Sequence, residues 1–163
     1  MKTDYHNRCR VAYTLDMSDH TSQPHGSQPA QSPTAKDAPK HIVLVGHCTP
    51  DASFLTMSVT GVLRGTKVSR VTTESHLQTA LNGGQVDLLL VNRVLEPGID
   101  DEDGVALIKR LHAAHPGLKF MLVSNYEHSQ QHAQAAGALL GFGKNDIRTP
   151  VLAERLKAAL LSA

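Results

Sequence analysis

Short apolar runs that stop abruptly at a glycine or a polar residue recur after residue 40, and they constrain the fold more than any other feature. The clearest runs are residues 42–45, 86–91 and 120–123. Runs this short and this apolar are typical of parallel strands that are buried on both faces of a sheet. We therefore expect three central strands at these places.

Between these runs lie segments with apolar residues at helical spacing. They predict helices at residues 50–65, 75–82, 104–114, 127–136 and 151–161, several of them ended by glycine or by Pro116-Gly117. Two weaker strands, at residues 67–72 and 138–142, complete five β–α units. Strict alternation of strand and helix indicates parallel strands joined by right-handed crossovers, which predicts an α/β, doubly wound domain.

Residues 1–40 have a different composition. From residue 18 to residue 40 the chain is rich in Ser, Gln, Pro and His and has no large apolar side chain. Such a segment cannot bury enough surface to offset the entropy of ordering it. We predict a disordered tail over residues 1–40 and one domain over residues 41–163. Tyr5 and Tyr13 belong to an unstructured start in this interpretation, with a short docking segment as the alternative.

The charge balance argues against two classes of partner. Lysine and arginine number 16 against 15 acidic residues, so nothing favours direct binding to nucleic acid or to an anionic membrane. No apolar run approaches the roughly 20 residues of a membrane span, and the N-terminus lacks the pattern of a secretory signal. Cys9 and Cys48 lie in no motif and suit a reduced compartment, so we expect a cytoplasmic protein.

Three segments together carry a family resemblance. They are VDLLLVN at residues 86–92 with the helix VALIKRL after Asp103-Gly104, FMLVSN at residues 120–125, and AGALLGFGK at residues 136–144. In this order and spacing, the chain from about residue 40 onward resembles the CheY-like receiver domains of two-component response regulators. The resemblance implies a flavodoxin-like (βα)5 three-layer sandwich with a five-stranded parallel sheet. Its site would lie at the C-terminal ends of the strands.

The resemblance implies a site that this chain keeps only in part. A working receiver holds Mg²⁺ with two carboxylates after the first strand and carries the phosphoryl group on an aspartate after the third. Here the acidic-pair positions fall on Gly46 and His47, and the phosphoacceptor position falls on Asn92. The hydroxyl and the lysine that contact phosphoryl oxygens are kept as Ser124 and Lys144. We therefore expect no catalytic residue, no metal and no cofactor.

Other positions depart from the family pattern in the same direction. The aromatic switch position, three residues before the lysine, falls on Gly141. The adjacent Phe142 cannot simply replace it, because alternate residues of a strand face opposite sides. Asn145 stands where the family has proline, and the loop after Asn92 is longer than the family's. These departures predict a module that phosphorylation does not switch.

The resemblance thus implies an atypical, degenerate receiver (a pseudo-receiver) in phosphorelay-type signal transduction. We expect a non-enzymatic protein-interaction module whose partner is a histidine kinase or another signalling component. The partner face of receivers involves the fourth helix, the fifth strand and the fifth helix, here about residues 127–161. A homodimer would use the same face. The chain stops after its last predicted helix, so we expect no DNA-binding output domain.

Three alternatives use the same residues differently. Ser124 and Lys144 could bind a phosphate-like anion, although pairing of Lys144 with a loop acid such as Asp100 or Asp101 is the favoured interpretation. His128 and His132 stand four apart, which is the spacing of a weak metal site, but a solvated helix face explains them better. Catalysis by Cys48 beside His47 is disfavoured, because adjacent side chains at a strand end point apart.

Overall fold

A computed structural model describes residues 39–161, so the predicted tail lies almost entirely outside the described residues and its boundary stays a prediction. The described chain forms one parallel sheet with the strand order β2-β1-β3-β4-β5. The strands are β1 (His41–Val45), β2 (Lys67–Val71), β3 (Leu88–Asn92), β4 (Phe120–Val123) and β5 (Leu139–Phe142). The predicted five-stranded α/β architecture is confirmed.

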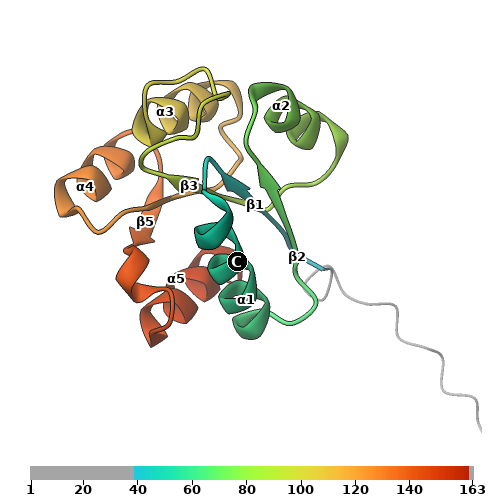
Figure 1. The fold of residues 1–163 in the computed structure, drawn as a ribbon, viewed down its shortest axis with the longest axis vertical. Helices are drawn as coiled ribbons and strands as arrows, with labels where there is room; N and C mark the ends of the chain where they lie inside the picture. Colours follow the sequence, from blue (N-terminus) through green and yellow to red (C-terminus); the bar gives the residue numbers. More distant parts are fainter. Residues whose placement is uncertain (1–38, 162–163) are drawn as a thin grey trace, which may run out of the picture. The chain divides into compact units, whose positions relative to one another are not determined.

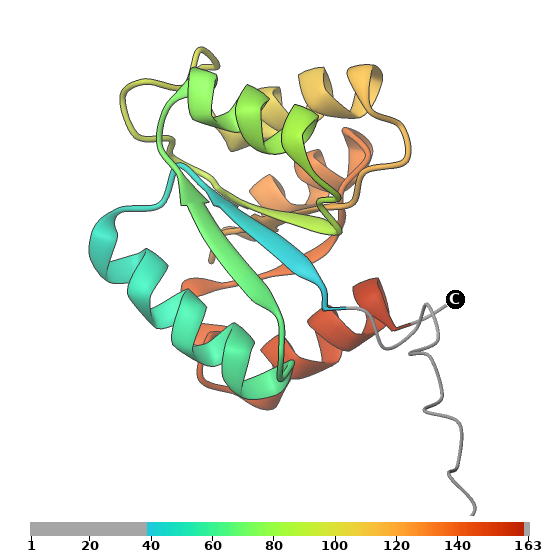
Figure 2. The ribbon, with the colours of Figure 1, turned by 90° about the vertical axis from the view of Figure 1, so that its right-hand side faces the viewer.

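Helices cover both faces of this sheet, as Figures 1 and 2 show. They are α1 (Thr49–Val62), α2 (Glu74–Gly83), α3 (Gly104–Ala114), α4 (Glu127–Ala135) and α5 (Pro150–Leu160), with a short 3-10 helix η1 (Lys144–Asp146) before α5. Helices α1 and α5 lie on one face, and α2, α3 and α4 lie on the other. No helix between residues 39 and 161 is long and apolar enough to cross a membrane.

The two layers of core follow from the alternation of side chains along each strand. In β1, Ile42 and Leu44 pack into the core shared with α1 and α5, whereas Val43 and Val45 pack into the core shared with α2, α3 and α4. The chain runs from β1 outward to β2 and then returns to β3 on the other side of β1. The switch point in strand order is therefore at the C-terminal ends of β1 and β3.

The largest difference from the predicted strand boundaries is at the start of β3, whereas the other strand ends differ by at most one residue. Strand β3 begins at Leu88 rather than at residue 86, because its pairing with β1 starts at Ile42 opposite Leu88. The preceding Asp87 is held at the N-terminal ends of β1 and β3, because its Oδ2 accepts from the His41 backbone amide at 2.8 Å. Its own amide donates to the His41 carbonyl at 2.9 Å. Asp87 thus aligns the start of β3 with the start of β1.

Helix α3 begins directly against the end of β3. Asp103 caps it, with Oδ1 accepting from the amides of Val105 and Ala106 at 2.9 Å each. At Gly104 an added Cβ atom would lie 2.2 Å from the Asn92 carbonyl oxygen. The predicted Asp-Gly step is therefore explained by a close approach that only glycine allows.

Candidate functional site

The predicted site residues meet at the C-terminal edge of the sheet. Gly46 and His47 follow β1, Asn92 ends β3, Ser124 follows β4, and Lys144 opens η1 after β5. Asn92, Ser124 and Lys144 line one cavity of about 170 Å³, whereas Gly46 and His47 are not among its lining residues. The positions predicted for the acidic pair therefore lie beside Asn92 but outside this cavity.

Gly46 cannot simply be replaced by an acidic residue. Its φ is 70°, in the left-handed region that L residues rarely adopt. An added Cβ would lie 2.7 Å from Leu95 Cδ2 and 3.2 Å from Leu95 Cα. Leu95 belongs to the loop that follows β3. The space beside position 46 is therefore filled by this loop, and both backbone and packing favour glycine.

His47 is turned into the protein interior. It is fully buried, and its Nε2 lies 3.1 Å from the Leu90 carbonyl oxygen. Because a carbonyl only accepts, Nε2 carries the proton, which leaves Nδ1 as the lone-pair nitrogen. That Nδ1 is buried without a partner. Burial lowers the pKa of His47 to about 4, against smaller opposing effects of the Leu90 carbonyl and Asp51. His47 is thus a neutral core residue at pH 7.

Asn92 joins the ends of two strands through its side-chain amide. Its Nδ2 donates to the Gly46 carbonyl at 3.1 Å and to the Val94 carbonyl at 2.7 Å. The residue is 8% exposed, so these two bonds satisfy a donor that water hardly reaches. A carboxylate has no hydrogen to donate. The amide at this position therefore has a structural role that an ionised aspartate could not fill.

Lys144 is paired with an acid that the sequence did not suggest. Its Nζ lies 2.5 Å from Asp51 Oδ2, in the first turn of α1. The expected pairing with Asp100 or Asp101 is wrong, because the acidic loop is held against α2 and α3 instead. The hydrogen bond from Lys144 lowers the pKa of Asp51, with burial opposing it. In the sequence Asp51 indicated only a helix start.

Two more residues shape the cavity. The Arg93 guanidinium lies over the Tyr126 ring, 4.7 Å from its centroid, and both residues line the cavity. The Ser124 hydroxyl oxygen accepts from the Tyr126 amide at 3.1 Å. No carboxylate among residues 39–161 forms an ion pair with Arg93. The cavity wall is therefore cationic.

The position of the aromatic switch is occupied by a neighbouring side chain. An added Cβ at Gly141 would lie 2.1 Å from the Leu122 carbonyl oxygen and 2.6 Å from Gln130 Oε1. From α4, Gln130 Nε2 approaches the carbonyl oxygens of Leu122, Ser124 and Phe142 at 3.1, 2.9 and 3.2 Å. The amide of Gln130 thus ties α4 to the ends of β4 and β5, and leaves no room for an aromatic ring at Gly141.

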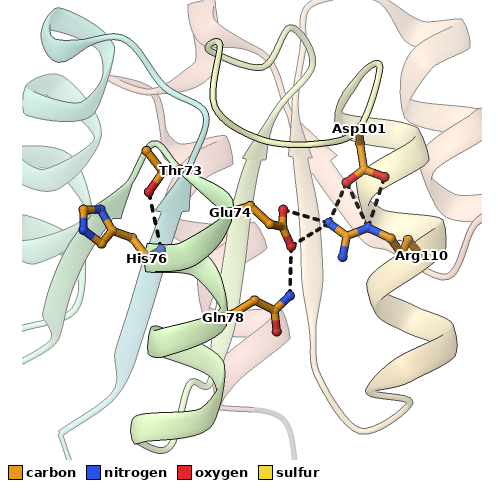
Figure 3. Close-up of polar contacts among 6 residues, drawn as sticks. All are labelled: Thr73, Glu74, His76, Gln78, Asp101 and Arg110. Atoms are coloured by element: carbon orange, nitrogen blue, oxygen red, sulfur yellow. Dashed lines mark hydrogen bonds and ion pairs between the residues drawn. The ribbon is translucent and has the colours of Figure 1, made fainter.

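The long loop between β3 and α3, residues 93–103, is fixed by a cluster of charged side chains. Arg110 of α3 lies between Asp101 of the loop and Glu74 of α2, as Figure 3 shows. Its Nη2 lies 2.7 Å from Asp101 Oδ2 and 3.0 Å from Glu74 Oε2. The Glu74 amide also donates to the Gly98 carbonyl at 2.6 Å. These bonds hold the acidic part of the loop away from Lys144.

Removing this cluster is expected to loosen the loop. Arg110→Ala should lower the free energy of unfolding by about 1 kcal/mol, since partly exposed ion pairs contribute little individually. It should also speed hydrogen exchange at the Glu74 amide, whose acceptor lies on the loop. Lys109→Ala, which removes an adjacent cation outside the cluster, is the control. An unchanged Glu74 exchange rate in Arg110→Ala would mean that other contacts, such as the burial of Ile99 and the Arg70–Glu96 pair, hold the loop.

Among residues 39–161, no third ligand joins the histidine pair of α4. The rings of His128 and His132 contact each other edge to face, with centroids 5.2 Å apart. Within the described part of the chain, no three His, Cys, Asp or Glu residues converge in a way that could hold a metal ion. The spacing alone therefore gives no support to the metal alternative.

The residues at the sheet edge do not fit the Mg²⁺ of a working receiver. Magnesium requires oxygen ligands in octahedral geometry. Gly46 has no side chain, His47 offers only a buried nitrogen, and the Asp51 carboxylate is engaged by Lys144. No step of phosphoryl transfer through a metal can be derived from these residues.

Comparison with known proteins is informative at the level of structure. No family model matches the chain, and no curated protein matches its sequence. The signal receiver domain of a DNA-binding response regulator from Colwellia psychrerythraea 34H superposes with a TM-score of 0.61 at 15% identity, covering 76% of this chain and 99% of that one. A response regulator from Thermotoga maritima gives a TM-score of 0.61 at 23% identity, with the same coverage.

A parallel sheet in this order, with polar residues at its switch point, defines a doubly wound α/β domain of the flavodoxin-like class. Within that class, the described residues have the fold of response-regulator receiver domains. The fold expected from the resemblance is thereby confirmed.

Proposed function

We propose that the protein is an atypical receiver of phosphorelay-type signal transduction that carries no phosphoryl group on Asn92 and acts as a non-enzymatic protein-interaction module. The observation that carries this proposal is the pair of hydrogen bonds from Asn92 Nδ2 to the carbonyls of Gly46 and Val94. Through these bonds, the residue at the predicted phosphoacceptor position links the end of β3 to the end of β1. Leu95 fills the space beside Gly46, and His47 is buried, so neither of the positions predicted for the acidic pair offers a carboxylate to a metal ion.

The first test asks whether the protein can be phosphorylated covalently. After incubation with acetyl phosphate and Mg²⁺, the intact mass of the full-length protein is expected to stay unchanged. Amide NMR spectra with beryllofluoride should show no shift around Asn92 that depends on Mg²⁺. A Mg²⁺-dependent mass increase of one phosphoryl group, at any residue of the site, would contradict the proposal.

The proposed partner surface is the face of α4, β5 and α5. It exposes Leu139 and Leu140 of the edge strand β5, which are 39% and 41% accessible, and Tyr126 lies just before α4. Large apolar side chains exposed on an edge strand favour a protein contact. We propose that a cytoplasmic histidine kinase or another signalling protein binds here, with a homodimer through the same face as the alternative. Direct binding to nucleic acid is not proposed.

Charge introduced on this face tests the surface. Leu140→Glu is expected to abolish retention of the partner that the full-length wild-type protein captures from its own cell extract, and to abolish any dimer seen by sedimentation velocity. Met57→Glu is the matched control, because Met57 is an exposed apolar residue of α1, a helix that is not part of the proposed α4, β5 and α5 surface. If Met57→Glu alone prevented binding, α1 would be the partner surface instead.

A further inference from the structure

A groove that is open to solvent runs between α3 and α4, which lie side by side on one face of the sheet (Figure 1). Its volume is about 460 Å³. Residues of both helices line it, namely Val105, Lys109, His112, Ala113, His132, Ala135 and Ala136. The groove is therefore distinct from the cavity beside Asn92 and from the exposed leucines of β5.

Three alanines make one end of this groove small and apolar. Ala113 lies near the end of α3, and Ala135 and Ala136 lie at the end of α4. Ala113 and Ala135 are exposed. Methyl side chains on both walls leave room between the helices, and an apolar body placed there would remove apolar surface from water. This end of the groove therefore suits an apolar group.

His112 gives the groove a rigid lining. Its ring contacts Phe120 edge to face, with the ring centroids 6.2 Å apart. It is also close to Gly137, where an added Cβ atom would lie 2.5 Å from His112 Cδ2. The ring cannot turn without disturbing these two contacts. The groove is therefore preformed rather than opened by a ligand.

Two basic residues line the groove about one helical turn before the alanines. Lys109 precedes Ala113 by four residues and His132 precedes Ala136 by four, a rise of about 6 Å along each helix. Between residues 39 and 161, no carboxylate pairs with Lys109 or His132, and no acidic residue lines the groove. Lysine has three N–H donors, and imidazole keeps a donor in either protonation state. Unpaired donors on both walls therefore favour an anionic group here.

Helix dipoles and volume restrict the ligand further. The alanines lie at the C-terminal ends of α3 and α4, where the helix dipole is negative and disfavours an anion. A protein cavity of about 150 Å³ is enough for benzene, and pockets for drug-sized ligands usually measure about 300–1,000 Å³. A groove of about 460 Å³ therefore has room for one medium-sized organic acid.

We propose that the groove between α3 and α4 binds an amphipathic monocarboxylate, a molecule with one carboxylate and an aliphatic or aromatic body. The carboxylate lies between Lys109 and His132. The apolar body lies on the alanines at the ends of the two helices. This proposal goes beyond the proposed function and does not depend on it, because the state of Asn92 does not enter the argument.

The test is amide NMR of the full-length protein, titrated with sodium octanoate below its micelle concentration. We expect saturable shifts at Ala113 and Ala135. Three probes separate the parts of the ligand. 1-Octanol keeps the chain without the charge and should bind about three- to five-fold more weakly, since an exposed ion pair contributes modestly. Octyltrimethylammonium reverses the charge and sodium acetate lacks the chain, so neither should give saturable shifts in the same concentration range.

Four variants test the two ends of the groove. Ala113→Leu fills the apolar end and should abolish the octanoate shift at Ala135, whereas Ala114→Leu, at an adjacent exposed alanine outside the lining, should bind like the wild type. Lys109→Gln should weaken binding about three- to five-fold. Lys157→Gln, which removes an exposed lysine of α5, should leave binding unchanged. Circular dichroism should confirm that every variant is folded.

Several results would overturn the proposal. They are the absence of saturable octanoate shifts at the groove, equal affinity for octanoate and 1-octanol, and unchanged binding by Ala113→Leu. Shifts of the same amides with protein concentration alone would assign the groove to a second copy of this chain and would also overturn it. None of these results bears on the phosphorylation test, which depends on Mg²⁺ and on a change of mass.

Discussion

Replacing Asn92 with aspartate is expected to destabilise the protein and to leave it unable to accept a phosphoryl group. At pH 7 the new carboxylate would face the carbonyl oxygens of Gly46 and Val94, which now receive two hydrogen bonds from the amide. Losing both donors and placing a buried anion against two acceptors should lower the free energy of unfolding by about 2–4 kcal/mol. Phosphorylation should still fail, because neither Gly46 nor His47 supplies a carboxylate for Mg²⁺.

The pH dependence of this loss identifies its cause. Burial and the two carbonyls should raise the pKa of an aspartate at position 92 above its unfolded value. The charged form then carries the penalty, so the loss is complete at high pH and shrinks as the pH falls and the carboxyl is protonated. Urea unfolding of wild type and Asn92→Asp, paired at each pH, measures this difference. Asn92→Ala is the control, because it removes both bonds without a charge and its loss should not vary with pH.

Two results with the Asn92→Asp variant would contradict these expectations. An Asn92→Asp variant as stable as the wild type at pH 7 would mean that the amide does not hold the two strand ends together. Uptake of a phosphoryl group with Mg²⁺ by this single variant would show that Gly46 and His47 were wrongly assigned to the acidic-pair positions.

Acid should destabilise the wild-type protein through His47. Its pKa falls from 6.5 to about 4 on folding, chiefly because of burial. Below pH 6.5 the unfolded chain therefore binds a proton that the folded protein does not, so stability is present above the unfolded pKa and is lost as the pH falls toward 4. From the difference in pKa the loss is about 3 kcal/mol. Unfolding in urea at several pH values measures it.

His47→Gln separates this effect from other titrations. Glutamine does not titrate, and its amide can still donate to the Leu90 carbonyl, so the variant should lack the loss between pH 6.5 and 4. Burial also lowers the pKa of His41, so the informative quantity is the difference between variant and wild type. Asp51 has a lowered pKa and contributes only at more acid pH, as it becomes protonated. Parallel pH profiles for the two proteins would mean that His47 is protonated in the folded state.

The fold was predictable because its signals are local and repeated. Strands such as β1 and β4 are nearly continuous apolar runs, and helices such as α1, α3 and α5 show their apolar face in the sequence itself. The strand ends that form the site follow from the same pattern, since the carboxyl ends of parallel strands share one edge. The pattern predicted a start of β3 two residues too early, because that start is fixed by a tertiary hydrogen bond. In this bond, the Asp87 carboxylate accepts from the His41 amide.

The residues that contact the site from other elements could not be predicted, because their positions depend on how the loops and helix ends fold over the sheet. Asp51 reaches Lys144 from a residue 93 positions away, and nothing near either residue indicates the pairing. Leu95 fills the space beside Gly46 because the long loop folds back over β1. Gln130 reaches Gly141 from α4 in the same way. The sequence predicts which positions depart from the family pattern, but only the structure shows which side chains lie beside them.

The packing of Leu95 on Gly46 has a consequence for how this protein could change over generations. A carboxylate at position 46 meets both a left-handed backbone, which costs about 1–2 kcal/mol for a residue other than glycine, and the side chain of Leu95. Substitution at position 92 carries its own penalty while the present loop remains. Every single step toward a phosphorylatable site is therefore expected to pass through a less stable protein unless the loop at residues 93–103 shortens first. A deletion in this loop would therefore have to precede any substitution, so point mutations alone are not expected to give this chain a phosphorylatable site.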